Sequence, residues 1–179
     1  MTGQSLRERF LDGMSRAACT VNVVTTDGPA GRRGVTVSAM TSVSVDSPNP
    51  TLLVCLHHLA PATSAILQNG VFCVNVLRAD QAFISDSFAG RIPQFRENKF
   101  ACATWKTQLT GAPRLAEPLV AFDCALLTSE RVGTHYVIIG EVQDVYLAGG
   151  GSALVYTNRT YATARPLAAP TPRVHGHCP

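Results

Sequence analysis

The stretch GVTVSAMTSVS, residues 34–44, alternates apolar positions with positions that carry hydroxyl groups. Its β-branched residues are typical of a strand, and residues two apart on a strand share a face. A continuous strand over residues 35–45 would therefore present the hydroxyls of Thr36, Ser38, Ser42 and Ser44 together. Such a face is either an ordinary solvated barrel surface or a hydrogen-bonding wall for a polar, planar ligand and its phosphate, and the stretch alone leaves both open.

Similar β-branched runs lie on both sides of this stretch, separated by clusters of Gly, Pro, Asn and Asp. Strands are predicted over residues 19–26, 51–58 and 71–77, over 120–131 and 136–147, and over 153–156, followed by 158–161. The two long runs are joined by Gly133-Thr134, and we expect them to pair antiparallel.

Helical signals are fewer. Residues 5–17 begin with Ser5 and Glu8 in the pattern of a capping box, and apolar residues recur there at helical spacing. Short helices are also predicted over 61–68, with a stop at Gly70, and over 79–88, whereas residues 91–118 are expected to be mostly irregular. Many strands without a repeating strand–helix–strand unit predict a mainly β fold, a barrel with a few short helices.

Length and charge limit the class of protein. The 179 residues suffice for one core, so we expect a single domain over residues 1–165 and a flexible, Pro-rich tail over 166–179. The net charge of +3 is scattered, which argues against nucleic acid as a partner. No apolar run is long enough to span a membrane, and the first residues lack the apolar core of a signal peptide. The sequence thus predicts a soluble, cytoplasmic protein.

Several kinds of site have no motif in this chain. No two of the six cysteines lie within four residues of each other, so no metal is expected; Cys55, Cys73 and Cys124 are expected to be structural. His175, His177 and Cys178 in the tail are not expected to bind metal either. Dinucleotide-binding, phosphate-loop and hydrolase signatures are also missing.

The chain resembles the short-chain NAD(P)H:flavin reductases. The resemblance runs from about residue 6 to residue 163. It is carried by residues 34–44, by LVCL at 53–56 and NGVFCVNVL at 69–77, and by FAG at 88–90, TGAP at 110–113, GTH at 133–135, GEV at 140–142 and LVY at 154–156. Within the family, the chain is most similar to the reductase components of two-component monooxygenases that act on phenol, chlorophenol or 4-hydroxyphenylacetate.

The resemblance implies an FMN-binding split β-barrel, Greek-key-like in topology, that dimerises and holds FMN or FAD in a groove near the subunit interface. The flavin ring would lie along Thr36 to Ser42, and Phe88-Ala89-Gly90 would close the groove. The ribityl chain and phosphate would lie near Cys55 to His58 and near Thr63-Ser64 at a helix start. The implied cofactor-binding residues are Thr36, Val37, Ser38, Ala39, Met40, Thr41, Ser42, Cys55, Leu56, His57, His58, Thr63, Ser64, Phe88, Ala89, Gly90, Arg159 and Tyr161.

The same resemblance implies a catalytic role for His135 on the nicotinamide side, because family members carry a Gly-x-His turn beside the flavin. The alternative is a turn histidine with only a local hydrogen bond. Arg159 and Tyr161 would either contact the dinucleotide or brace the C-terminal strand. Arg32-Arg33 would either pair with the 2′-phosphate of NADPH or form a solvated turn.

Two departures from the family pattern concern the phosphate contacts. Many members have Asp-Pro-Pro where this chain has the longer turn 46–50, and they often have Asn-Arg or Asn-Ala, soon followed by Ser, where it has His57-His58 and then Ala60. The choice between FMN and FAD therefore stays open.

The predicted activity is hydride transfer from NADH or NADPH to FMN or FAD, with release of reduced flavin to a partner monooxygenase. The two cofactors carry that chemistry, which agrees with the lack of a nucleophile or paired carboxylates. Two alternatives remain: a split-barrel oxidase whose bound flavin acts directly on an organic substrate, and a flavin- or haem-binding sensor without enzymatic activity.

Overall fold

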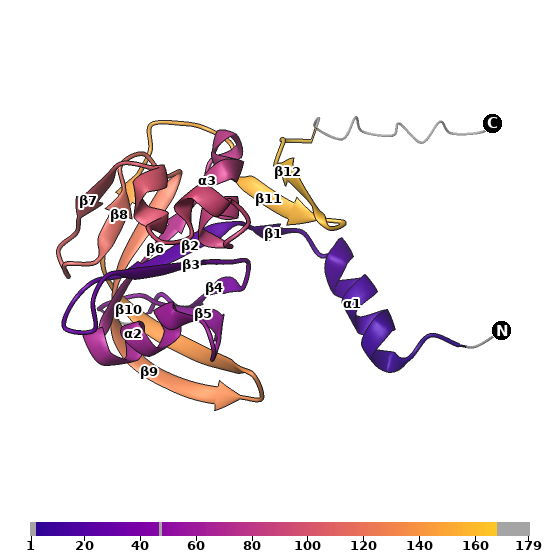
Figure 1. Cartoon of the computed structure of the whole chain (residues 1–179), viewed down its shortest axis with the longest axis horizontal. Coiled ribbons are helices and arrows are strands. Elements are labelled where there is room, and N and C mark those ends of the chain that lie inside the picture. Colours follow the sequence, from indigo (N-terminus) through magenta and orange to yellow (C-terminus); the bar gives the residue numbers. More distant parts are fainter. Residues whose placement is uncertain (1–2, 47, 168–179) are drawn as a thin grey trace, which may run out of the picture.

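One curved antiparallel sheet forms most of the molecule in the computed structural model, which describes residues 3–46 and 48–167 (Figure 1). Its seven strands follow the order β3-β2-β6-β9-β10-β5-β4. They span Asn22–Thr26 (β2), Arg33–Val37 (β3), Met40–Ser44 (β4), Thr51–His57 (β5), Val71–Val76 (β6), Val120–Val132 (β9) and His135–Leu147 (β10). The two edge strands, β3 and β4, are consecutive in the chain, so Ser38-Ala39 links opposite edges of the sheet.

Two smaller sheets and several helices complete the fold (Figure 1). The three-stranded sheet has the order β1-β11-β12, and β7 pairs with β8. These strands are Cys19–Thr20 (β1), Trp105–Thr107 (β7), Pro113–Leu115 (β8), Leu154–Thr157 (β11) and Thr160–Thr163 (β12). The α-helices are Leu6–Arg16 (α1), Pro61–Asn69 (α2) and Ala82–Phe88 (α3), and the 3-10 turns are Ala79–Gln81 (η1), Pro93–Phe95 (η2) and Lys99–Cys102 (η3). The mainly β prediction is confirmed.

Local signals placed several elements correctly. Ser5 and Glu8 form the capping box of α1, and Gly70 ends α2 in the left-handed conformation, with φ 70°. The β9 and β10 strands form the expected hairpin around Gly133-Thr134. The region 91–118, predicted to be mostly irregular, contains the 3-10 turns η2 and η3 and also the short β7–β8 ribbon.

The prediction of one continuous strand over 35–45 is wrong. The chain breaks at Ser38-Ala39, where the backbone N–H of Met40 donates to the carbonyl of Ser38 at 3.1 Å. Thr36 therefore lies on β3 and Ser42 on β4, at opposite edges of the sheet, and their hydroxyls do not share one strand face. Ser and Ala are compatible with strand or turn, so period-two alternation does not register this break.

The interior of the curved sheet holds the main core. Its buried side chains come from β2, β3, β5, α2, β6, β9 and β10: Val24, Val37, Leu52, Val54, Leu56, Ile66, Phe72, Val74, Cys124 and Ile138. Cys73 and Cys124 are buried as expected, and burial raises the pKa of both thiols, whereas Cys55 is only partly buried. A second core, which includes Ile84, Phe88 and Leu154, packs α3 and the three-stranded sheet against the large one.

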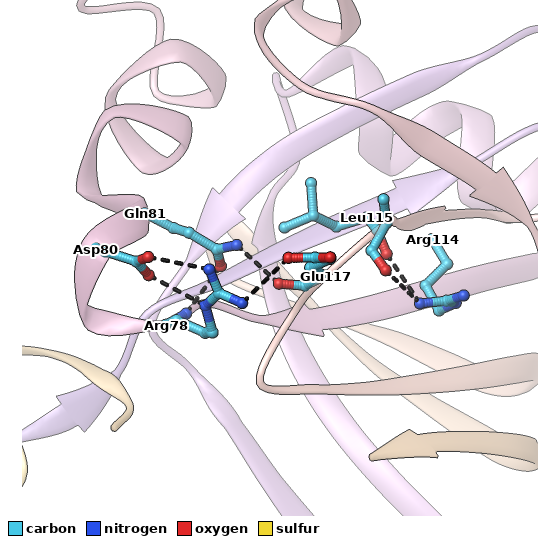
Figure 2. Close-up of polar contacts among 7 residues, drawn as sticks. Arg78, Asp80, Gln81, Arg114, Leu115 and Glu117 are labelled. Carbon is cyan, nitrogen blue, oxygen red and sulfur yellow. Dashed lines mark hydrogen bonds and ion pairs between the residues drawn. The ribbon is translucent and has the colours of Figure 1, made fainter. Parts of the chain in front are cut away.

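Arg78 anchors the start of the segment that leads into α3 (Figure 2). Its guanidinium pairs with Asp80 at 2.9 Å and with Glu117 at 3.4 Å. The Gln81 side chain donates to the carbonyl of Glu117 at 2.8 Å and accepts from the backbone N–H of Arg78 at 2.9 Å. Arg114 donates to the carbonyls of Leu115 and Ala116, the residues before Glu117. These contacts hold η1 against the segment that enters β9.

The N-terminal helix α1 projects from the body of the protein beside the β11–β12 hairpin (Figure 1). None of its residues is buried, and the side chains of Leu6, Phe10 and Met14 are 75%, 63% and 51% exposed. The domain boundary at 165 stays a prediction, and most of the predicted tail, 168–179, lies outside the described residues.

Candidate functional site

A groove of about 200 Å³ lies between the end of β3, α3 and the β11–β12 hairpin. It is lined by Val21, Thr36, Val37, Ser38, Ser85, Ala89, Arg91, Tyr156 and Tyr161. Five of the predicted cofactor-binding residues are thus brought together from three distant segments, 36–38, 89 and 161. Ser85 and Arg91 were not predicted, because no local pattern distinguishes them from other polar residues around a short helix.

A polar network forms one wall of this groove. The Tyr161 hydroxyl lies 2.8 Å from Asp86 Oδ1 and 2.9 Å from Ser85 Oγ, and Arg91 pairs with Asp86 at 2.9 Å. Burial raises the pKa of Tyr161, so the phenol is neutral at physiological pH and can donate a hydrogen bond. Thr36 donates its hydroxyl proton to the carbonyl of Ser85 at 2.7 Å, which ties β3 to α3.

The predicted cofactor-binding residues 38–42 lie on both sides of the link between the edge strands β3 and β4. Ser38 is exposed and lines the groove, whereas Thr41 and Ser42 are exposed on β4 and do not line it. Ala39 is exposed too, and its carbonyl accepts from the backbone N–H of Cys55 at 3.2 Å; Met40 is partly buried against the core. Of the predicted hydroxyl wall, Thr36 and Ser38 belong to this groove.

Three histidines gather where β5 ends and β10 begins. His57 is paired with His135 across the strands, and their ring centroids are 5.1 Å apart; the rings of His57 and His58 stack at 5.0 Å. The backbone N–H of His58 donates to the carbonyl of Thr134, and Nδ1 of the exposed His135 lies 3.1 Å from Thr134 Oγ1. Partial burial, with the cationic Arg131 and the two other histidines nearby, lowers the pKa of His58.

The helix α2 begins just after these histidines. Thr63 is buried and donates its hydroxyl to the carbonyl of His57 at 2.9 Å, and the exposed Ser64 donates to the carbonyl of Pro61 at 3.2 Å. Both hydroxyl protons are therefore engaged by backbone. The N-cap residue is Ala60, which has no side-chain acceptor. Pro61 has no N–H, and the N–H of Thr63 already donates to the carbonyl of Ala60, so among the first three helix residues the N–H of Ala62 is the donor that remains for an anion.

Three further predicted residues lie away from the groove. Leu56 is buried in the main core. Phe88, predicted to close the groove, is 1% exposed and packs edge-on against Phe100 and Trp105. It is the last residue of α3, and the exposed Ala89 and then Gly90, where φ is 76°, follow it. Arg159 sits in the β11–β12 turn and lies 3.7 Å from Asp12 of α1, which is the bracing alternative.

No group of three or more His, Cys, Asp or Glu side chains in residues 3–46 and 48–167 is arranged to hold a metal ion. Within the same residues, no helix has the length and apolar character needed to cross a bilayer.

Comparison with known proteins agrees with the fold and with the motifs. Residues 14–165 match the flavin reductase like domain, and the chain belongs to this family. It is 47% identical over 155 residues to the FMN reductase (NADH) RutF of Ancylobacter novellus, which covers 87% of this chain and 83% of the relative.

Two solved structures show the same fold. The flavin reductase component BorF of a bacterial two-component tryptophan halogenase is 29% identical, with a TM-score of 0.77 over 90% of this chain and 99% of that one. The flavin reductase PheA2 is 26% identical, with a TM-score of 0.79 over 91% of this chain and all of the other. The family resemblance stated from the sequence is confirmed.

Proposed function

We propose that this protein is an NADH:flavin oxidoreductase that reduces FMN and releases it to a partner monooxygenase. The observation that carries the proposal is the groove, where Thr36 to Ser38, Ala89 and Tyr161 converge in a chain of this family. FMN is preferred to FAD, and NADH to NADPH, because the relatives at 43–47% identity are FMN reductases (NADH).

The residues around the groove suit a flavin edge. The Ser38 hydroxyl and the exposed backbone at Ser38-Ala39 offer both donors and acceptors, as the carbonyl and N–H groups of a flavin pyrimidine require. The Tyr161 hydroxyl, whose proton is engaged by the side chains of Asp86 and Ser85, offers its oxygen as an acceptor. A bound flavin supplies the hydride-accepting chemistry. The chain itself orients the flavin ring and the nicotinamide ring. His135, exposed at the start of β10, is proposed to contact the nicotinamide nucleotide.

The phosphate of the flavin is proposed to lie near His57, His58 and the first turn of α2. Donors there are the backbone N–H of Ala62 and imidazole N–H groups rather than the Thr63 and Ser64 hydroxyls, whose protons bind backbone carbonyls. The backbone N–H groups of residues 58, 59, 60 and 63 are already bonded within the chain. Because the pKa of His58 is lowered, this phosphate site carries less positive charge at neutral pH than one built on arginine. Such a site favours release of the reduced flavin.

The protein is also proposed to act as a cytoplasmic homodimer. The groove of about 200 Å³ is smaller than the roughly 300–1,000 Å³ typical of sites that enclose a ligand, so a second subunit would complete it. The uncovered apolar face of α1 supports the same assembly. Free cysteines at positions 19, 55, 73, 102 and 124 agree with a reducing compartment.

The activity is tested by following loss of NADH absorbance with purified protein and added FMN, FAD or no flavin. We expect fast turnover that depends on added flavin and is faster with FMN. A stoichiometric flavin complex that survives gel filtration and oxidises an organic substrate would favour the oxidase alternative. Absence of turnover with every combination would contradict the proposal and leave a binding or sensing role.

A further inference from the structure

Arg91 is the one charged residue that lines the groove of about 200 Å³, among the residues that the structure describes. Its backbone is fixed by the C-terminal cap of α3. The N–H of Gly90 donates to the carbonyl of Ser87 at 3.1 Å, and the N–H of Arg91 donates to that of Asp86 at 2.9 Å. With φ at 76° for Gly90, these two bonds form a Schellman motif. The helix end therefore holds Arg91 beside the groove.

The guanidinium of Arg91 is only partly used by the chain. Its Nη1 group donates to Asp86 Oδ1 at 2.9 Å and to the Tyr161 hydroxyl oxygen at 3.4 Å. The Nε and Nη2 groups make no hydrogen bond to any residue in 3–46 or 48–167, so their N–H groups are available to a ligand. The bond to Asp86 raises the pKa of Arg91, so the side chain is a permanent cation.

The carboxylate of Asp86 opposes this cation from a less accessible position. Its side chain is 30% exposed, against 58% for Arg91, and its Oδ1 accepts from both Arg91 and the Tyr161 hydroxyl. The rings of Tyr156 and Tyr161, 5.7 Å apart, line the same groove and keep its surroundings less polar than water. An anion in the groove is therefore attracted by Arg91, and Asp86 offsets part of that attraction.

Hydride transfer changes the charge of the flavin ring. NADH gives up one proton and two electrons together and becomes NAD⁺, and the neutral oxidised ring that gains them acquires one negative charge. The phosphate of FMN is the same before and after the reaction. A cation beside the ring therefore distinguishes reduced from oxidised flavin, whereas a cation at the phosphate binds both forms equally.

We propose that Arg91 makes the groove bind reduced flavin more tightly than oxidised flavin, and that Asp86 limits this preference so that the reduced flavin is released. The preference favours hydride transfer toward the flavin. An unopposed cation would retain the product, which has to reach a partner enzyme. This inference rests on the proposed function, since it places the flavin ring in the groove that Arg91 lines.

The experiment measures two dissociation constants by calorimetry on the whole protein, one for oxidised FMN and one, without oxygen, for dithionite-reduced FMN. We expect Arg91→Gln to reduce the preference for reduced FMN about tenfold, which equals a fall of about 30 mV in the two-electron potential of the bound flavin. Arg91→Lys keeps the charge and should keep most of the preference. Asp86→Asn retains an acceptor for the Tyr161 hydroxyl and should increase the preference.

The matched control is Arg96→Gln, because Arg96 lines a cleft with Arg32, Lys99 and Trp105 and does not line the groove. This variant should leave the ratio of the two dissociation constants unchanged, even if both constants rise. Equal weakening of both forms in Arg91→Gln would assign the guanidinium to the phosphate and overturn the inference, as would equal binding of both forms by the wild type. NADH turnover with FMN is scored separately, so the proposed activity stands or falls on its own measurement.

Discussion

At the scale of single residues, three histidines join a departure from the family pattern, His57-His58, to a residue that matches it, His135. His135 and His57 face each other across β10 and β5, and His58 stacks on His57. His57 and His135 are 78 positions apart in the sequence (135 − 57), and only strand pairing brings them into contact. Their different surroundings indicate different roles, since His135 is exposed and His58 is partly buried.

We expect His135→Ala to raise the KM for NADH several-fold while the affinity for FMN changes little, because the imidazole is proposed to contact the nicotinamide nucleotide. The matched control is His58→Ala in the same cluster, which should weaken FMN and leave the KM for NADH close to that of the wild type. Steady-state kinetics and flavin binding by calorimetry measure both. Unchanged NADH kinetics in His135→Ala would remove this residue from the site.

The pH dependence of FMN binding offers a separate test of His58. The pKa of His58 is lowered, so the side chain is neutral at neutral pH and gains its charge only below its ordinary titration range. If it contacts the flavin phosphate, FMN should therefore bind more tightly as the pH falls through that lowered value. The His58→Ala control should lose this part of the pH dependence.

At the scale of elements, the break between β3 and β4 decides where the site forms. It turns one hydroxyl-rich stretch into two edge strands, and it leaves Thr36 and Ser38 beside α3 rather than beside Ser42. β3 is held against α3 at two points, by the Thr36 bond to Ser85 and by close packing of Gly34 on Phe88.

Close packing at Gly34 predicts a measurable loss of stability. An added Cβ would lie 2.5 Å from the Phe88 ring, a distance that forces the buried ring or the strand to move. We expect Gly34→Ala to lower the free energy of unfolding by about 1–3 kcal/mol, as overpacking typically does. The control is Gly13→Ala, where nothing lies within 4 Å and helix propensity favours alanine. Urea denaturation compares them, and equal stability of the two variants would contradict this account.

At the scale of the whole molecule, the helix α1 has no packing partner for its apolar face among the described residues of a single chain. It has 11 residues, none of them buried, whereas isolated helices of fewer than roughly 12 residues are marginal in water. Its attachment to the body runs through its C-terminal end, where the backbone N–H of Asn158 donates to the carbonyl of Ser15 and Arg159 lies near Asp12. A second copy that covers its apolar face would stabilise both the helix and the groove beside it.

We expect the protein to sediment as a dimer, and Phe10→Ser to shift the equilibrium toward monomer, because the side chain is 63% exposed in one chain and apolar. Arg7→Ser changes the same helix at a charged position and should leave the dimer intact. Analytical ultracentrifugation over a range of concentrations measures both. A wild-type protein that remains monomeric at all concentrations would refute the proposed assembly.

The fold could be predicted further from the sequence than the site. The capping box of α1, the Gly70 stop and the hairpin at Gly133-Thr134 depend on residues adjacent in sequence, so local chemistry suffices to place them. The central residues of most strands could be predicted for the same reason, because a run of β-branched residues is also a local signal. Three pieces were missed: the break at Ser38-Ala39, the β7–β8 ribbon, too short for a periodic signal, and the Asn158-Arg159 turn, where two residues other than glycine adopt positive φ.

By itself the sequence determined the mainly β class, the family and the types of residue available to bind a flavin, because apolar periodicity and short motifs are local properties. Only the tertiary structure decided which of those residues meet. It placed Tyr161 beside Ser38, moved Phe88 into the core, and gathered Arg32, Lys99 and Trp105 around one cleft. Such groupings depend on the pairing and curvature of strands that are distant in the chain. That pairing is a cooperative result of burying one shared core, so it cannot be inferred from the spacing of residues along the sequence.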